Sequence, residues 1–180
     1  KVDDDIQKCK DLEILLCSCY VWNWEITNYF AKEVKKINPN CLIVFGGPQV
    51  PNHSEGFFEE YPYVDILVHG EGEYVLANFF AAFLKNKNYS NVNGIETKDF
   101  RNPPEPRIDN LEAIPSVYLT NLMWDVVEKI EGVHWLASWE TNRGCPYACT
   151  FCDWGSATAT KMRKFSDERL FKEIEWFANN

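Results

Sequence analysis

Three cysteines lie within eight positions near the carboxyl end of the chain, in the string Arg-Gly-Cys-Pro-Tyr-Ala-Cys-Thr-Phe-Cys. Their spacing is Cys145-x3-Cys149-x2-Cys152, and thiolates on so short a loop can converge on one metal centre. A structural zinc site usually has four ligands in two pairs, and ferredoxin-type loops also supply four cysteines per cluster. No cysteine follows Cys152, and the nearest histidine, His134, precedes the loop. Three thiolates suit a 4Fe–4S cluster with one iron free of protein ligands, and such an open site is typical of catalytic or substrate-binding metals.

Two alternatives remain open for this loop. It could be a zinc- or iron–sulfur-binding module with a structural or interaction role, which a fourth nearby ligand would favour. Its cysteines could instead be buried and inert, as isolated cysteines often are. The remaining cysteines are scattered through the first part of the chain: Cys9, Cys17, Cys19 and Cys41. An odd total without a secretory signal argues against a disulfide scaffold and predicts a reduced, cytoplasmic protein.

The elements on either side of the cysteine loop must position it. His134–Thr141 has a strand-like pattern, and Ser166 is a good helix N-cap followed by acidic residues that suit the helix dipole. The predicted apolar face of this helix is Leu170, Phe171, Ile174, Phe177 and Ala178. The cysteines therefore occupy a loop that leaves a strand and enters a helix, the functional end of a β/α unit.

The first half of the chain alternates between short apolar runs and helical patterns. The predicted strands are Leu12–Cys17, Cys41–Phe45 and Val64–Val68, and the predicted helices are Asn23–Ile37, Gly56–Glu60 and Glu73–Leu84. The expected inward faces are Ile26, Phe30, Val34 and Ile37 in the first long helix, and Val75, Leu76, Phe79, Phe80 and Phe83 in the last. This order predicts an α/β fold with a parallel sheet covered on both faces and right-handed crossovers.

Glycine turns follow two of the predicted strands, at Gly46-Gly47 and at Gly70 and Gly72. They are either simple tight turns or places where a ligand approaches the backbone, because ligands of open α/β sheets bind outside the carboxyl ends of the strands. The following stretch is polar and rich in proline, which is typical of an interdomain connection. Within it, Gly94–Lys98 is a candidate small strand.

The cysteine string closely resembles the cluster motif of the radical S-adenosylmethionine (SAM) enzymes, with Phe151 as the aromatic residue before the last cysteine. The resemblance implies that Cys145, Cys149 and Cys152 hold a 4Fe–4S cluster after the first strand of a partial, TIM-type barrel. In that family the unique iron binds the amino and carboxylate groups of SAM, and an electron cleaves SAM to methionine and a 5′-deoxyadenosyl radical. The backbone near Phe151 would then lie against the adenine.

The upstream part is similar to the cobalamin-binding domain that precedes the barrel in one large branch of this family. The matching residues are Ser18 after the first strand, Gly46 and Gly47 after the second, and Gly70 and Glu71 after the third. The resemblance implies cobalamin as a second cofactor at these residues. The Asp-x-His-x-x-Gly motif, which supplies the lower cobalt ligand in some members, does not occur in this chain.

The resemblance implies three segments: an incomplete, cobalamin-binding Rossmann-like domain over 1–88, a linker over 89–132, and the first β/α unit of the radical SAM barrel over 133–180. The chain has no initiator Met and stops as a helix ends, so we expect an internal fragment that does not turn over by itself. Methyl transfer, a ring-forming oxidation and another radical rearrangement all remain open, as does a degenerate domain without cofactors. No residue is predicted to act as a general base.

Charge and the remaining polar residues narrow the choice of partners. With 27 acidic and 18 basic residues, the net charge of −9 argues against nucleic-acid binding, and no apolar stretch is long enough for a membrane span. The expected partners are a small-molecule substrate, not identified by the sequence, and a flavodoxin- or ferredoxin-like reductant.

His53 and His69 are interpreted as surface or hydrogen-bonded residues. The aromatic residues at 20, 22 and 24 are either core or a ligand face.

Overall fold

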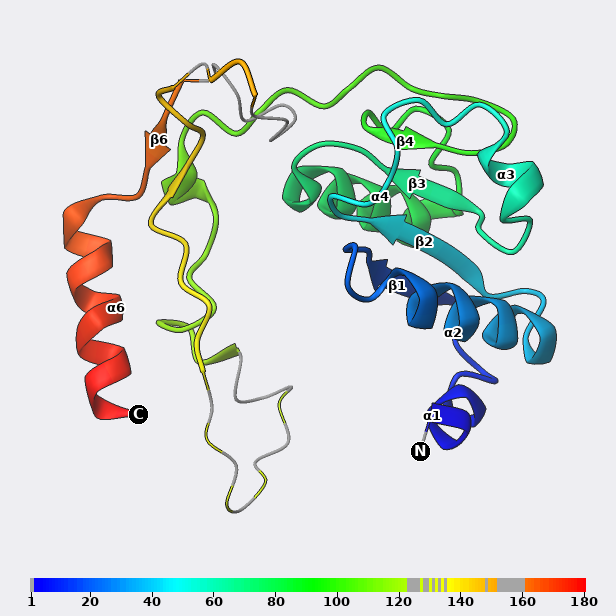
Figure 1. Ribbon diagram of the computed structural model, residues 1–180, viewed down its shortest axis with the longest axis horizontal. Helices are drawn as coiled ribbons and strands as arrows, with labels where there is room; N and C mark the ends of the chain where they lie inside the picture. Colours follow the sequence, from blue (N-terminus) through cyan, green and yellow to red (C-terminus); the bar gives the residue numbers. More distant parts are fainter. Residues whose placement is uncertain are drawn as a thin grey trace. The chain divides into compact units, whose positions relative to one another are not determined.

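The computed structural model describes residues 2–122, 127, 130, 132, 134, 136–147, 149–151 and 161–180. They form two compact units, Lys1–Arg107 and Ile108–Asn180, each described here by itself. Figure 1 shows both units and labels most of their elements. Residues 89–107, which the sequence suggests are part of a linker, pack with the first unit.

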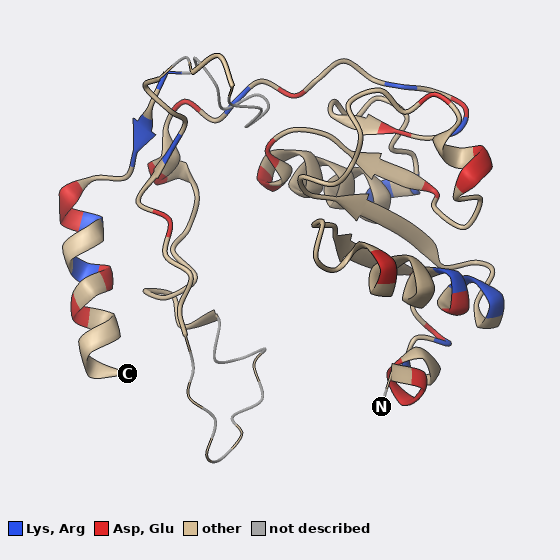
Figure 2. Cartoon of the chain, in the orientation of Figure 1, with Lys and Arg blue, Asp and Glu red and all other residues tan. Residues whose placement is uncertain are grey.

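A four-stranded sheet in the order β1-β2-β3-β4 forms the centre of the first unit (Figure 1). The strands β1 (Ile14–Ser18), β2 (Leu42–Gly46) and β3 (Ile66–Val68) are parallel, as predicted. They carry no charged residue (Figure 2), which suits parallel strands buried on both faces. The small strand β4 (Ile95–Glu96) confirms the candidate at 94–98 and pairs antiparallel with β3.

Four helices accompany this sheet: α1 (Val2–Lys8), α2 (Trp24–Ile37), α3 (Phe57–Glu60) and α4 (Gly72–Asn86). The last three confirm the predicted helices. The first was not predicted, because its sequence is mostly polar and offers only Ile6 as a buried anchor. Its three aspartates lie in the first turn, where the helix dipole favours negative charge.

The two faces of the sheet carry separate apolar clusters, because successive side chains of a strand point to opposite faces. One face packs against α1, α2 and α3, and the other packs against α4. The first cluster includes Ile43, Phe45 and Leu67 from the strands, and the second includes Val44, Ile66 and Val68. The prediction of a sheet covered on both faces is confirmed.

The buried face of α2 differs in part from the predicted one. Val34 is buried as expected, but Ile26 and Ile37 are exposed and Ala31 is buried instead. The helix is rotated because the Trp24 ring packs against aromatic rings of β2 and α3. A wide indole at the start of the helix therefore decides which face turns inward, and the small Ala31 allows the helix to approach the sheet.

The second unit contains the short 3-10 helix η1 (Leu111–Ala113), the strands β5 (Asn142–Arg143) and β6 (Arg163–Lys164), and helix α6 (Asp167–Asn179). The strands β5 and β6 form an antiparallel pair. The Ser166 hydroxyl accepts a hydrogen bond from the backbone N–H of Arg169, which confirms the predicted helix start. Among the described residues of both units, no helix is long and apolar enough to span a membrane.

The strand predicted over His134–Thr141 is not formed in the residues described there. Residues 134 and 136–141 adopt no strand, and the Leu136 side chain is 96% exposed. A strand is held by hydrogen bonds to a neighbour. In the part of this unit that the structure describes, the only neighbour is β6, which pairs with the two residues after this stretch. The partial barrel therefore stays a prediction.

The face of α6 that packs also differs from the predicted one. Leu170 and Phe177 are partly buried, but Phe171 and Ile174 are exposed, as is Ala178. The most buried side chain of the helix is Glu173, at 2% exposure. The spacing of apolar residues could not predict this buried face of α6, because a hydrogen-bonded carboxylate lies at its centre.

Candidate functional site

Five residues that the sequence singled out for cofactor binding lie along one edge of the sheet. Ser18 ends β1 and pairs in register with Gly46, which ends β2. Gly47 follows directly, and Gly70 and Glu71 connect β3 to α4. Because these positions all follow parallel strands, they meet at the carboxyl edge, where open α/β sheets bind ligands.

The two glycines of this edge with a positive φ have different surroundings. Gly47 has φ +100°, and a Cβ there would lie 2.7 Å from the carbonyl oxygen of Cys19. The Cys19 N–H donates to the Gly46 carbonyl at 2.6 Å, and the Gln49 N–H donates to the Cys19 carbonyl at 3.1 Å. Gly47 is thus needed where the loops after β1 and β2 touch. Gly70, with φ +78°, has no atom within 4 Å of its Cβ position and is open to an approaching group.

A stacked aromatic pair, with one partly buried and one exposed ring, lies just beyond β1. The Asn23 side chain accepts from the Tyr20 N–H at 2.7 Å and donates to the Ser18 carbonyl at 2.8 Å, which folds the chain into a turn. On this turn the rings of Tyr20 and Trp22 stack with centroids 4.5 Å apart, and Trp22 is 77% exposed. Trp24, by contrast, is partly buried and packs against the core cluster. A flat exposed indole at the carboxyl edge provides an apolar surface for a planar ligand.

In the sequence, the Asn at position 23 distinguishes the two stacked aromatic residues, 20 and 22, from the aromatic residue at 24. An asparagine directly before a helical pattern marks the end of the preceding turn. Residues 20 and 22 therefore belong to the turn and residue 24 to the helix.

A polar cluster around Glu96 lies beside this edge and was not predicted from the sequence. The Glu96 carboxylate is 2.8 Å from Nε2 of His69, accepts from the Ser54 hydroxyl, and lies 3.6 Å from a guanidinium nitrogen of Arg101. Glu96 and Ser54 are buried. The cluster joins the loop after β2, the end of β3 and β4. The ring of His69 is therefore hydrogen-bonded, in agreement with its interpretation from the sequence.

Replacing Glu96 by alanine should lower the free energy of unfolding by about 1–3 kcal/mol, because buried donors then lose their shared acceptor. The measurement is urea denaturation followed by circular dichroism. Glu55→Ala, at the exposed position next to Ser54, is the matched control and should leave the unfolding midpoint nearly unchanged. An equal effect of the two substitutions would show that the Glu96 cluster adds no stability.

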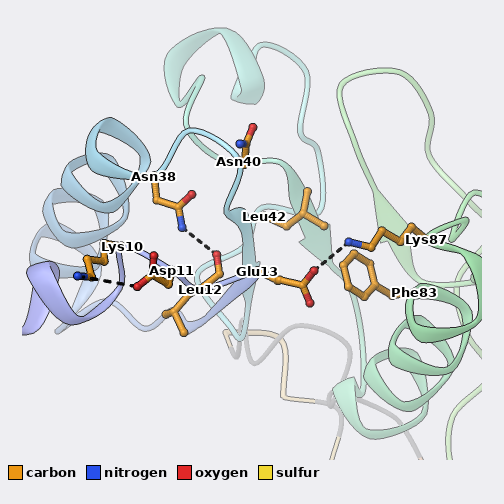
Figure 3. Close-up of a pocket in the computed structure, with 9 residues that line it drawn as sticks. All are labelled: Lys10, Asp11, Leu12, Glu13, Asn38, Asn40, Leu42, Phe83 and Lys87. Atoms are coloured by element: carbon orange, nitrogen blue, oxygen red, sulfur yellow. Dashed lines mark hydrogen bonds and ion pairs between the residues drawn. The ribbon is translucent and has the colours of Figure 1, made fainter.

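A separate cavity of about 430 Å³ lies at the opposite, amino edge of the sheet (Figure 3). Most of its polar side chains already bind one another or the backbone. The Lys87 ammonium is 2.9 Å from the Glu13 carboxylate, and the Asn38 amide donates to the Leu12 carbonyl at 2.8 Å. The cavity is open and offers no buried, unpaired polar group among these residues, so the carboxyl edge remains the candidate site.

The cysteines of the first unit have thiols with raised pKa values. Burial raises the pKa of the Cys17 thiol to about 12 and the pKa of the Cys19 thiol to about 11. Burial also raises the pKa of Cys9 and of Cys41. Because the thiolate is the nucleophile and the metal ligand, these protonated thiols are poor at both tasks.

The cysteine loop spans residues 144–162, between β5 and β6. Cys145 is partly buried, Cys149 is exposed, and the Phe151 side chain is 90% exposed. Cys152 lies outside the described residues, so the convergence of the three thiols stays a prediction. Without Cys152, the residues that the structure does describe contain no group of three or more potential metal ligands. The donor set fits an iron–sulfur cluster, since thiolates are its usual ligands.

The base of this loop is fixed on the segment that begins the second unit. Arg143 pairs with Arg163 across the β5–β6 ladder, and a guanidinium nitrogen of Arg163 donates to the Ile108 carbonyl at 2.6 Å. The Ser166 N–H donates to the Glu112 carboxylate at 2.6 Å. The carboxyl end of the cysteine loop is therefore held by this stretch of chain, and its amino end is held by the pairing of β5 with β6.

Comparison with known proteins gives relatives for almost the whole chain. No protein-family model matches it. It is 46% identical over 175 residues to the cobalamin-dependent radical SAM methyltransferase TokK of Streptomyces tokunonensis. It is 42% identical over 177 residues to the 2-(S-pantetheinyl)-carbapenam-3-carboxylate methyltransferase of Streptantibioticus cattleyicolor. These alignments cover 93% and 94% of this chain, but only 26% of each relative.

A solved structure has a similar fold. It is the radical S-adenosylmethionine methyltransferase TsrM from Kitasatospora setae, determined with a tryptophan substrate and a SAM analogue bound. The TM-score is 0.65, and the match covers 99% of this chain and 36% of that protein. At 16% sequence identity, this likeness concerns the fold alone.

Proposed function

Since the chain is homologous to cobalamin-dependent radical SAM methyltransferases and spans about a quarter of their length, we propose that the full-length protein is an enzyme of this kind. The observation that carries the proposal is the loop with Cys145-x3-Cys149-x2-Cys152, fixed at its base by the β5–β6 pair. The two relatives named above are methyltransferases by name, so methyl transfer is the reaction we assign among those that the sequence left open.

Cys145, Cys149 and Cys152 would hold a 4Fe–4S cluster that leaves one iron without a protein ligand. A bound cluster would supply the electron that cleaves SAM, after reduction by a flavodoxin- or ferredoxin-like protein. The exposure of Cys149 and Phe151 leaves the loop accessible to SAM, whose adenine would lie near the backbone of Phe151. The role of the chain here is to present thiolates and to orient SAM by backbone contacts.

The carboxyl edge of the first unit would hold cobalamin. Ser18, Gly46 and Gly70 provide small side chains or none beside the strand ends, and the stacked Tyr20–Trp22 pair offers a flat apolar surface. Gly47 contributes by keeping the loops after β1 and β2 in contact. Glu71 lies at the start of α4, next to Gly70, and would contact polar groups at the rim of the macrocycle.

The test is anaerobic reconstitution of the full-length protein with iron, sulfide and cobalamin, followed by incubation with SAM and dithionite. We expect about four irons and four sulfides per chain, the visible absorbance of bound cobalamin, and 5′-deoxyadenosine as a product of SAM cleavage. With a methyl acceptor present, S-adenosylhomocysteine should also form, because SAM that donates its methyl group is converted to it. Stoichiometric zinc without iron-dependent absorbance would instead support a structural metal-binding module.

A further inference from the structure

The carboxylate of Glu173 is the most buried charged group among the described residues of the second unit. One oxygen accepts from the indole N–H of Trp139 at 2.6 Å, and the other accepts from Nε of Arg169 at 3.1 Å. Burial alone would raise the pKa of Glu173, but hydrogen bonds from Ser116, Trp139 and Arg169 and the charge of Arg169 hold it below its usual value. Glu173 is therefore ionised at neutral pH and is paired with a largely buried guanidinium.

Arg169 extends these contacts to other parts of the unit. A second guanidinium nitrogen donates to the Ile114 carbonyl at 2.6 Å, and the guanidinium lies over the Phe165 ring at 4.1 Å. Phe165 is buried and follows β6 directly. The Arg169–Glu173 pair thus touches the stretch around residues 114–116, the segment that leads into the cysteine loop, and the segment that leaves it.

Stability alone does not explain a buried ion pair at this place. Removing two charges from water costs free energy, and replacing such a pair by apolar side chains of similar volume is often neutral or even stabilising. Apolar contacts are not directional, whereas hydrogen bonds fix the angles between the groups that they join. Trp139 lies shortly before Cys145, and α6 begins shortly after the loop ends.

We propose that Arg169 and Glu173 are positioning residues that hold α6 against Trp139 and Phe165, which flank β5 and β6, and thereby fix the base of the cysteine loop. By setting the geometry of the loop, they determine the affinity of the cluster for SAM. The inference rests on the proposed function, since it concerns the affinity of the cluster for SAM. It goes beyond that function because neither residue belongs to the cysteine motif.

The experiment compares two double variants of the full-length protein. R169M/E173M removes the buried pair, and E168M/K172M removes an exposed pair with the same spacing on the same helix. We expect both to fold and to bind the same amount of iron. Only R169M/E173M should bind SAM about tenfold more weakly, as with other residues that orient metal ligands, and only its reduced cluster should lose the change in electron paramagnetic resonance spectrum on SAM addition.

The possible results separate the two proposals. A wild-type protein that forms no iron–sulfur cluster would overturn the proposed function and this inference together. A wild-type cluster combined with unchanged SAM binding in R169M/E173M would overturn only the inference and leave the pair a structural contact. If R169M/E173M does not fold, Trp139→Phe decides, because it removes the indole N–H bond to Glu173 and keeps an aromatic ring beside Phe177. Weaker SAM binding supports the positioning role and unchanged binding overturns it.

Discussion

Replacing Cys149 by alanine is expected to reduce the iron content after anaerobic reconstitution from about four atoms per chain to about none. Two thiolates cannot hold a cluster that already lacks a protein ligand on one iron. Cys149 is exposed, so its replacement leaves no cavity in the part of the unit that the structure describes. The measurements are iron and sulfide analysis and the visible absorbance of the cluster.

Cys17→Ala is the matched control for this loss. Cys17 is also a free cysteine, but it lies in β1, and burial raises the pKa of its thiol to about 12. This variant should keep the full iron content of the wild-type protein. Retention of the cluster by the Cys149 variant would mean that the metal is bound elsewhere, and equal losses in both variants would point to general misfolding.

The second large effect is expected from Gly47→Ala. The new methyl group would lie 2.7 Å from the Cys19 carbonyl oxygen, on a backbone with φ +100°. The strained backbone and the overpacking together should lower the free energy of unfolding by about 2–5 kcal/mol. Relief of the clash requires the loops after β1 and β2 to move apart, so cobalamin binding should be lost as well. Urea denaturation and the absorbance of bound cobalamin measure the two effects.

Gly56→Ala distinguishes the energetic cost of a strained backbone from the cost of a close atomic contact. Gly56 also has a positive φ, at +77°, but no atom lies within 4 Å of its Cβ position. Its replacement should cost only about 1–2 kcal/mol, the conformational term, and should leave cobalamin binding intact. If Gly47→Ala were as mild as Gly56→Ala, the tight contact with Cys19 would have no energetic importance.

Local patterns in the sequence were sufficient to predict most of the regular elements. Short apolar runs bounded by Gly, Pro and Asn identified the three parallel strands, and the N-cap at Ser166 located the start of α6. The position of the candidate site followed as well, because the carboxyl ends of parallel strands share an edge. These features depend on neighbours in the sequence or on a general rule of topology.

Features that depend on distant contacts could not be predicted in this way. The rotation of α2 follows from the size of Trp24 against rings that come later in the chain, and Glu173 is inward only because Trp139 and Arg169 satisfy it. Glu96 likewise binds partners from three separate segments. A hydropathy pattern assigns such carboxylates to the surface, because it contains no information on their partners.

The antiparallel pair of β5 and β6 also has a consequence for how fast a metal cluster can assemble. A free segment must lose conformational entropy when its donor groups gather at one point, and this loss grows with the length of the loop that closes. Here Arg143 and Arg163 already join the two ends of residues 144–162. Much of the loss occurs when the protein folds, so the thiols have a high effective concentration before iron arrives. If the three thiols bind a cluster as proposed, binding of the first thiol would make capture of the next an intramolecular step.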